Sequence, residues 1–127
     1  MVTVVAQNQA MTAVKNAMSV IYTDPIDLGG NDRATVMWMI HYLWAFDVGG
    51  GAAVGTAGWA AEVSNDGVNW VPVGAAGSDT SAVAPPLPLP KTFAANGQFI
   101  RFKMTLMVAP GDLTGVAFDL HVKFDHI

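Results

Sequence analysis

The clearest pattern in the sequence is an alternation of apolar and polar side chains in two segments, residues 100–108 and 116–126. Alternation of this kind gives one apolar and one polar face, as a half-buried β-strand requires. The sequence therefore predicts two strands, and the turn Ala109–Leu113 between them predicts that they pair antiparallel. Their apolar faces consist of Ile100, Phe102, Met104, Leu106 and Val108, and of Val116, Phe118, Leu120, Val122 and Phe124.

Residues 33–46 form another predicted strand, but both of its faces are largely apolar. Parallel sheets show this pattern because helices cover both sides, and this chain has no room for such helices. We expect the heavier face, with Trp38, Tyr42 and Trp44, to fill the core, since large rings span the roughly 10 Å between packed sheets. A neighbouring subunit, or alternatively a long loop, then covers the other face. The subunit-interface candidates on that face are Met37, Met39, His41 and Leu43.

Shorter strands are expected at Ser19–Thr23, Trp59–Ser64 and Asn69–Val73. The turn Asn65–Gly67 joins the last two, because Asp-Gly supplies the positive φ that tight hairpins need. Residues 10–18 fit either a strand or a short helix, because their apolar positions suit both periods.

Two stretches have few side chains that pack. Residues 49–58 are mostly Gly and Ala, so we expect a mobile loop there. The segment Ala82–Pro90 is rich in Pro, which predicts an extended polyproline II conformation. The strands and antiparallel turns together predict an all-β fold, an antiparallel two-sheet β-sandwich or jelly roll. At this length we expect a single domain, residues 1–127. Within it, residues 1–18 either belong to the sandwich or form an arm.

Two segments resemble parts of known sandwich proteins. Glu62–Trp70 has the spacing S-x-DG-x-x-W, and Phe99–Phe102 resembles the Y-I/V-R-I/F strand that follows it. Together they resemble discoidin-like (coagulation factor C-type) sandwiches and phage structural proteins, over residues 59–106. The resemblance implies a sandwich fold in which the Asp-Gly turn reverses the chain and Trp70 plugs the sandwich edge. The disulfide that joins the ends of discoidin domains is absent, because the chain has no Cys.

The composition favours a protein that associates with others. Charged residues make up 13% of the chain, about half of the fraction usual for soluble domains. We therefore expect apolar outer surface to be buried against other subunits, with a surface of small residues as the alternative. The net charge is −4 and the six Lys and Arg are scattered. Nucleic-acid binding needs clustered cations, so we expect no nucleic-acid partner.

Membrane and secretion signals are not expected either. The most apolar stretch, Ala34–Phe46, has 13 residues, whereas a bilayer-spanning helix needs about 20. The first residues lack the cationic start and the long apolar run of a signal peptide. The absence of Cys excludes a disulfide framework, a thiolate metal site and a Cys nucleophile.

Catalytic motifs are not found in the sequence. There is no G-x-S-x-G element for a Ser nucleophile and no G-x-G-x-x-G run for a phosphate. We expect no catalytic residue, no metal and no cofactor, and therefore a protein that is not an enzyme. The less favoured alternatives are a zinc site at Asp119, His121 and Asp125 and a calcium site at Asp24, Asp27 and Asp32.

Aromatic rings are the remaining candidate chemistry. Sugar-binding modules stack the apolar face of a sugar on exposed Trp or Tyr rings. Packing in a core or an interface is the competing explanation, because each ring buries about 150–250 Å² there. The alternative sugar-binding candidates are Trp38, Trp44 and Trp59.

Low charge, a strand with two apolar faces and the partial resemblance favour one function over the others. We expect a self-assembling structural protein, a virion component such as a phage capsid decoration or a fibre or tail accessory subunit. Its expected partners are its own copies and/or other virion proteins, in a virion or outside the cell. A carbohydrate-binding module with an exposed Trp platform, and hence a carbohydrate partner, is the alternative.

Overall fold

The computed structural model describes residues 2–14, 17–50, 55–80, 90–108 and 113–126. Within these ranges the chain forms nine β-strands and no helix. The same ranges accordingly hold no helix with the length and apolar character needed to span a membrane. The strands are β1 (Val2–Val14), β2 (Met18–Tyr22), β3 (Ile26–Asp27), β4 (Arg33–Phe46), β5 (Gly55–Ser64), β6 (Val71–Thr80), β7 (Lys91–Ala94), β8 (Phe99–Val108) and β9 (Leu113–Asp125).

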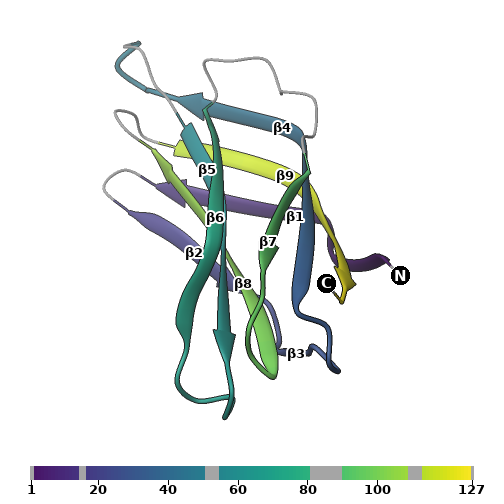
Figure 1. The fold of residues 1–127 in the computed structure, drawn as a ribbon. Helices are drawn as coiled ribbons and strands as arrows, with labels where there is room; N and C mark the ends of the chain where they lie inside the picture. Colours follow the sequence, from purple (N-terminus) through teal and green to yellow (C-terminus); the bar gives the residue numbers. More distant parts are fainter. Residues whose placement is uncertain (1, 15–16, 51–54, 81–89, 109–112, 127) are drawn as a thin grey trace.

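The strands form two antiparallel sheets that pack face to face (Figure 1). The first sheet has the order β1-β9-β4-β7, and the second has the order β2-β8-β5-β6, with β3 pairing with β8. The predicted fold class, an all-β antiparallel two-sheet sandwich, is confirmed. Of the less certain segments, Ala82–Pro90 lies outside the described residues except for Pro90. The predicted loop 49–58 is wrong for residues 55–58, which belong to β5, and its residues 51–54 lie outside the described residues.

The N-terminal segment is a strand rather than a helix. β1 pairs with β9 from Val2 to Val14. Met11 and Ala13 are buried in the core, whereas Thr12 and Val14 between and after them are exposed. This period of two decides between the two predicted structures of residues 10–18, because a helix would bury every third or fourth residue.

The core lies between the apolar faces of β8 and β9. Phe102 from β8 and Phe118 from β9 are fully buried. Trp59 of β5 lies 6.4 Å from Phe102, ring centroid to ring centroid, and 6.3 Å from Phe93 of β7. Aromatic side chains from both sheets therefore fill the space between them, which is where most of the burial energy of a sandwich arises.

The predicted antiparallel pairing of β8 with β9 is wrong. β8 belongs to the second sheet and β9 to the first, and residues 109–112 of the predicted turn lie outside the described residues. Alternation decides which side chains of a strand share a face, but it does not decide which strand lies beside it. Here the two apolar faces bury each other across the core instead of lying side by side in one sheet.

The turn between β5 and β6 has the predicted geometry. Gly67 has φ = 76°, a conformation that side-chain-bearing residues rarely adopt. The Asp66 carboxylate accepts hydrogen bonds from the backbone N–H groups of Asn69 and Val68 (both 2.8 Å), and its second oxygen accepts one from the Asn69 amide (2.7 Å). The buried Ser64 hydroxyl also donates to Asp66 (2.9 Å). These bonds, the one from Asn69 N–H foremost, hold the pKa of the Asp66 carboxyl well below its usual value.

The predicted position of Trp70 in the edge of the sandwich is wrong. Its half-buried ring lies on the outer face of the second sheet, 4.4 Å from Cζ of Arg101. The same guanidinium lies 4.3 Å from the ring centroid of Tyr22, and its Nε donates to Glu62 (2.8 Å). Cation–π contacts of this kind are attractive, so the stack fastens the hairpin to the sheet and joins the two segments that carry the sequence resemblance.

Replacement of a core ring tests the assignment of the faces. We expect Phe118→Ala to lower the free energy of unfolding by about 3–5 kcal/mol, the usual cost of emptying an aromatic core site. The exposed Val71 offers a control, since Val71→Ala is expected to change stability by less than about 0.5 kcal/mol. Urea denaturation of the three proteins gives the comparison, and equal losses in the two variants would contradict the assignment.

The hydrogen bonds of Asp66 predict a dependence of stability on pH. Because its pKa is lower in the folded than in the unfolded chain, where it is about 3.9, the unfolded chain binds the proton first as the pH falls. The stabilisation by the carboxylate is therefore complete above that value and is lost as the pH falls through the folded pKa. The difference between the melting temperatures of the wild type and Asp66→Asn should begin to shrink below about pH 4 and continue to shrink as the pH falls further. A difference that is the same at acid and neutral pH would contradict this.

Candidate functional site

A β-bulge in β4 decides which of its side chains face outwards. Ile40 pairs with Phe118 of β9, and Tyr42 pairs with the next residue, Ala117, so that His41 is one extra residue in β4. A bulge of this kind reverses the alternation of the strand beyond it. After His41 the even-numbered side chains therefore point outwards instead of into the core.

The reversal corrects the predicted faces of this strand. Trp38 packs against the core as expected, with its ring centroid 4.4 Å from that of Phe118. Tyr42 and Trp44 do not fill the core, since 50% and 38% of their surfaces are exposed, and Leu43 packs against the core instead of facing outwards. Of the four predicted interface residues, Met37, Met39 and His41 lie on the outer side of the first sheet or at its bulge, and Leu43 does not.

Three aromatic rings consequently lie on the outer face of the first sheet. Tyr42, Trp44 and Phe46 occupy alternate positions of β4, and Phe46 is 54% exposed. We call these three residues the outer aromatic patch. Their neighbours on β9 are small: Trp44 pairs with Gly115, and a Cβ at that position would lie 2.6 Å from the Trp44 ring. The ring can lie against the sheet only because residue 115 has no side chain.

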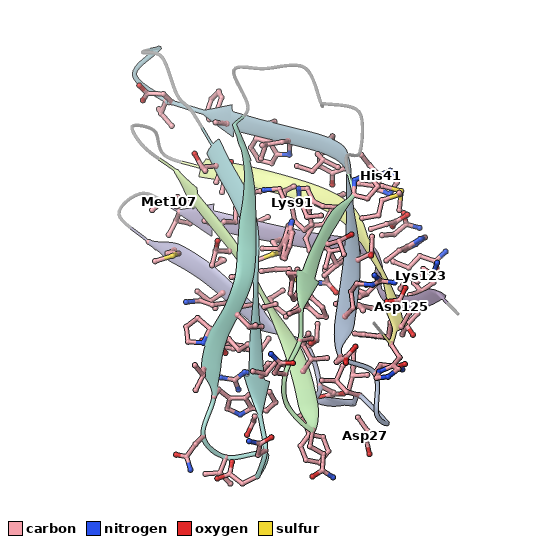
Figure 2. The ribbon with its side chains drawn as sticks, in the orientation of Figure 1. Asp27, His41, Lys91, Met107, Lys123 and Asp125 are labelled. Atoms are coloured by element: carbon pink, nitrogen blue, oxygen red, sulfur yellow. The ribbon has the colours of Figure 1, made fainter. Side chains whose placement is uncertain are left out.

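The other end of the same outer face is polar. His41 Nε2 lies 3.1 Å from an oxygen of Asp119, which also accepts the backbone N–H of Asn8 (2.7 Å). The Asn8 bond, followed by the His41 bond, lowers the pKa of Asp119. Arg33 makes a two-bond contact with Asp125, with distances of 2.6 and 3.0 Å. Figure 2 shows His41 and Asp125 on the same side of the molecule, so these polar pairs occupy the part of the face that precedes the aromatic patch along β4.

The three sugar-binding candidates have different environments. Trp38 packs on the core and Trp59 is almost fully buried, with 3% of its surface exposed. Neither presents a ring to a ligand, whereas Trp44 does. Among the described residues, no group of three or more His, Asp or Glu has a geometry that could hold a metal ion.

Part of the free edge of β1, between Ala10 and Val14, is hydrogen-bonded within the chain. Three successive carbonyls that point away from β9 accept hydrogen bonds from the chain itself. Ala10 accepts the Gln9 side-chain amide (3.2 Å), Thr12 accepts the Ser19 hydroxyl, and Val14 accepts the backbone N–H of Ala17 (3.0 Å). Unpaired edge carbonyls are what an added strand requires, so this part of the β1 edge is poorly suited to the addition of a strand.

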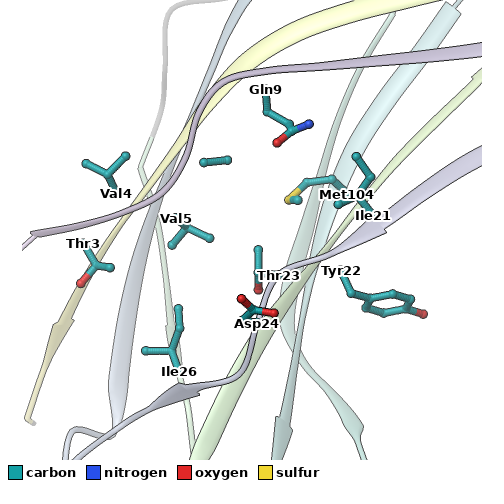
Figure 3. A pocket seen from close by; sticks show the side chains of 11 residues that line it. Thr3, Val4, Val5, Gln9, Ile21, Tyr22, Thr23, Asp24, Ile26 and Met104 are labelled. Atoms are coloured by element: carbon teal, nitrogen blue, oxygen red, sulfur yellow. The ribbon is translucent and has the colours of Figure 1, made fainter.

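A groove of about 370 Å³ lies between the edges of the two sheets, where β1 approaches β2 and β3 (Figure 3). Val5, Ile26 and Met104 form its apolar part, and Gln9 and Asp24 supply polar groups. None of the residues that the sequence analysis singled out for interface or sugar contact lines this groove.

Comparisons with known proteins identify the fold. No protein-family model and no curated protein sequence matches the chain. The solved structure of the PBSX exported protein XepA is similar over 100% of this chain, with a TM-score of 0.58 and 14% identity. The chain spans 37% of the length of XepA. The sandwich fold that the sequence resemblance implied is thus confirmed.

Two further structures are similar with lower TM-scores. TmCBM61 in complex with β-1,4-galactotriose gives a TM-score of 0.49 at 10% identity, covering 91% of this chain and 70% of that one. A structure of infectious bursal disease virus, Gx strain, gives 0.46 at 10% identity, covering 99% and 32%.

Deletion of single residues tests the bulge. Because Ile40 and Tyr42 already pair with consecutive residues of β9, deletion of His41 should give a regular strand and leave every other side chain on its present face. Deletion of Met39 would also remove the extra residue, but it would turn Ile40 outwards and place His41 opposite Phe118, facing the core, and should therefore destabilise the fold much more. Near-ultraviolet circular dichroism and thermal denaturation distinguish the two variants. Two deletions that are equally damaging would contradict the bulge.

Proposed function

We propose that this chain is a self-associating structural module that binds its own copies, or other proteins of a virion, through the outer face of the first sheet. The observation that carries the proposal is the outer aromatic patch, three partly exposed rings in a row on a regular sheet. Contiguous exposed apolar surface of this kind is typical of interaction sites, and aromatic residues are enriched in the centres of protein interfaces.

The charges support the same face. The whole chain has 13% charged residues. At the polar end of the face Arg33 pairs with Asp125 and His41 lies beside Asp119, whereas Lys123 is exposed. A partner surface can therefore approach without leaving Arg33 or Asp125 unpaired, which would be costly in a buried contact, and it would need a polar group for Lys123. The occupied carbonyls of Ala10, Thr12 and Val14 disfavour the addition of a strand at that part of the β1 edge.

A non-catalytic role, in a virion or outside the cell, is part of this proposal. It follows the sequence resemblance to phage structural proteins, and the similarity to XepA supports it in fold.

Carbohydrate binding at Trp44 is the second candidate. The observation that favours it is the position of the Trp44 ring over Gly115 with 38% of its surface exposed. A ring held in this way can stack on the apolar face of a sugar, and it loses little conformational entropy on binding because it is already fixed.

Two matched double variants test the proposed function. Tyr42→Lys with Phe46→Lys should weaken self-association at least about tenfold, because an ammonium group is costly in an apolar contact. Val68→Lys with Val71→Lys adds the same charge at two exposed apolar positions outside the face and should have no such effect. Analytical ultracentrifugation measures both against the wild type.

The outcomes separate the two functions. A wild-type chain that stays monomeric at high concentration, and that binds no virion protein, would contradict the association proposal. If Trp44→Ala folds normally but loses binding to a polysaccharide that the wild type retains, carbohydrate binding through the patch is the better explanation.

A further inference from the structure

The end of the sandwich opposite the outer aromatic patch has a hollow that the proposed function does not use. Three chain segments line it: the loop before β4, the turn after β5 and the turn between β7 and β8. Its volume is about 540 Å³, and a second hollow of about 390 Å³ shares Asn65 and Asn96 with it. Four side-chain amides line the larger one, and we call it the amide hollow: Asn31, Asn65, Asn96 and Gln98.

The three segments are fixed to one another by backbone hydrogen bonds. Leu28 N–H donates to the carbonyl of Gln98 (2.8 Å), and Gln98 N–H donates to the carbonyl of Ser64 (3.1 Å). Ala95 N–H donates to the carbonyl of Asp32 (2.8 Å). Leu28 and Ala95 are also buried in the core. The backbone that presents the four amides is therefore held in place before any ligand binds, which lowers the entropic cost of binding.

The four amides do not have the structural role that such residues usually have in turns. Asn and Asp in turns normally bond to nearby backbone N–H groups, and Asp27, Asp47 and Asp66 do so here. Within the described residues no side-chain hydrogen bond is found for these four, and Asn65, Asn96 and Gln98 are exposed to water. Their donors and acceptors are therefore accessible to a ligand that displaces water.

The chemistry of the lining indicates the class of ligand. Each amide offers two N–H donors and a carbonyl acceptor. Asp32 is the one charged side chain among the described lining residues, and it lies 3.2 Å from His126. The described lining has no cation and contains the Asp32 carboxylate, so an anionic ligand is disfavoured. A neutral molecule whose hydroxyl groups both donate and accept matches the amides in each position.

We propose that the amide hollow binds a neutral saccharide through these four amides. The hollow is open to solvent, so a bound saccharide would keep one side exposed. None of the three residues of the outer aromatic patch lines the hollow, so the two surfaces can be occupied together. The inference is thus independent of association through the outer face.

The test titrates the full chain, labelled with ¹⁵N, with cellotriose, maltotriose and β-1,4-galactotriose, and with trigalacturonate as an anionic probe. We expect at least one neutral trimer to shift the backbone amide signals of residues 30–32, 65 and 96–98. Asn96→Ala should weaken its binding roughly three- to tenfold, the effect of losing one net hydrogen bond. Gln7→Ala, an exposed amide on β1, is the matched control and should leave the affinity unchanged.

Further variants keep the test decisive. If Asn96→Ala does not fold, Asn65→Ala replaces it, because Asn65 lines both hollows and is exposed. Trp44→Ala should not change binding in the hollow. The proposal is overturned if no neutral trimer shifts these signals or if trigalacturonate binds more tightly than every neutral trimer. It is also overturned if binding is lost in Trp44→Ala and kept in Asn96→Ala.

Discussion

The apolar faces of β8 and β9 are buried against each other, and the positions of the other strands follow from that contact. β2, β3 and β5 pair along β8, and β1 and β4 pair along β9. Directly opposite residues of paired strands share a face. The burial of Phe102 and Phe118 therefore decides, strand by strand, which side chains of each sheet reach the solvent. The outer aromatic patch and the polar groups beside it lie on the outer face of the first sheet, whose inner face contributes to this core.

Much of this arrangement could be predicted from the sequence. A strand that is buried on one face has apolar residues at every second position, and this pattern can be read directly from the sequence. The strands β4, β8 and β9 are where the alternation placed them, and the Asp-Gly turn was marked by the one residue type that adopts positive φ freely. The strands that pair with β8 could not be predicted. The alternation shows that one face of β8 is buried, but it does not show whether β9 lies beside β8 in the same sheet or opposite it in the other sheet. Contacts between distant segments decide that question, and single-strand patterns do not contain them.

The candidate site was harder to predict, for a reason that lies in β4 itself. A bulge shifts the alternation of apolar and polar residues by one position. The shift can be recognised in a sequence only if one face of the strand is polar, because only then do the two faces differ in residue type. Both faces of this strand are apolar, so the shift at His41 left no mark, and Tyr42, Trp44 and Leu43 were assigned to the wrong sides. Gly115 was the available signal, because a glycine within a strand often lies beneath a large neighbouring side chain. The amide hollow left no signal of its own, since residues 31, 65 and 96 meet only in the folded chain.

The occupied carbonyls on the edge of β1 have a consequence for symmetry. A sheet that grows by addition of strands can continue without limit, as in fibres. In contrast, when the outer face binds the same face of a second copy, neither face remains available for a third copy. Such an isologous pair is related by a twofold axis and is closed. Self-association through the outer face alone would therefore stop at the dimer. Any larger particle that contains this chain would need a second, different contact, either between dimers or with another protein.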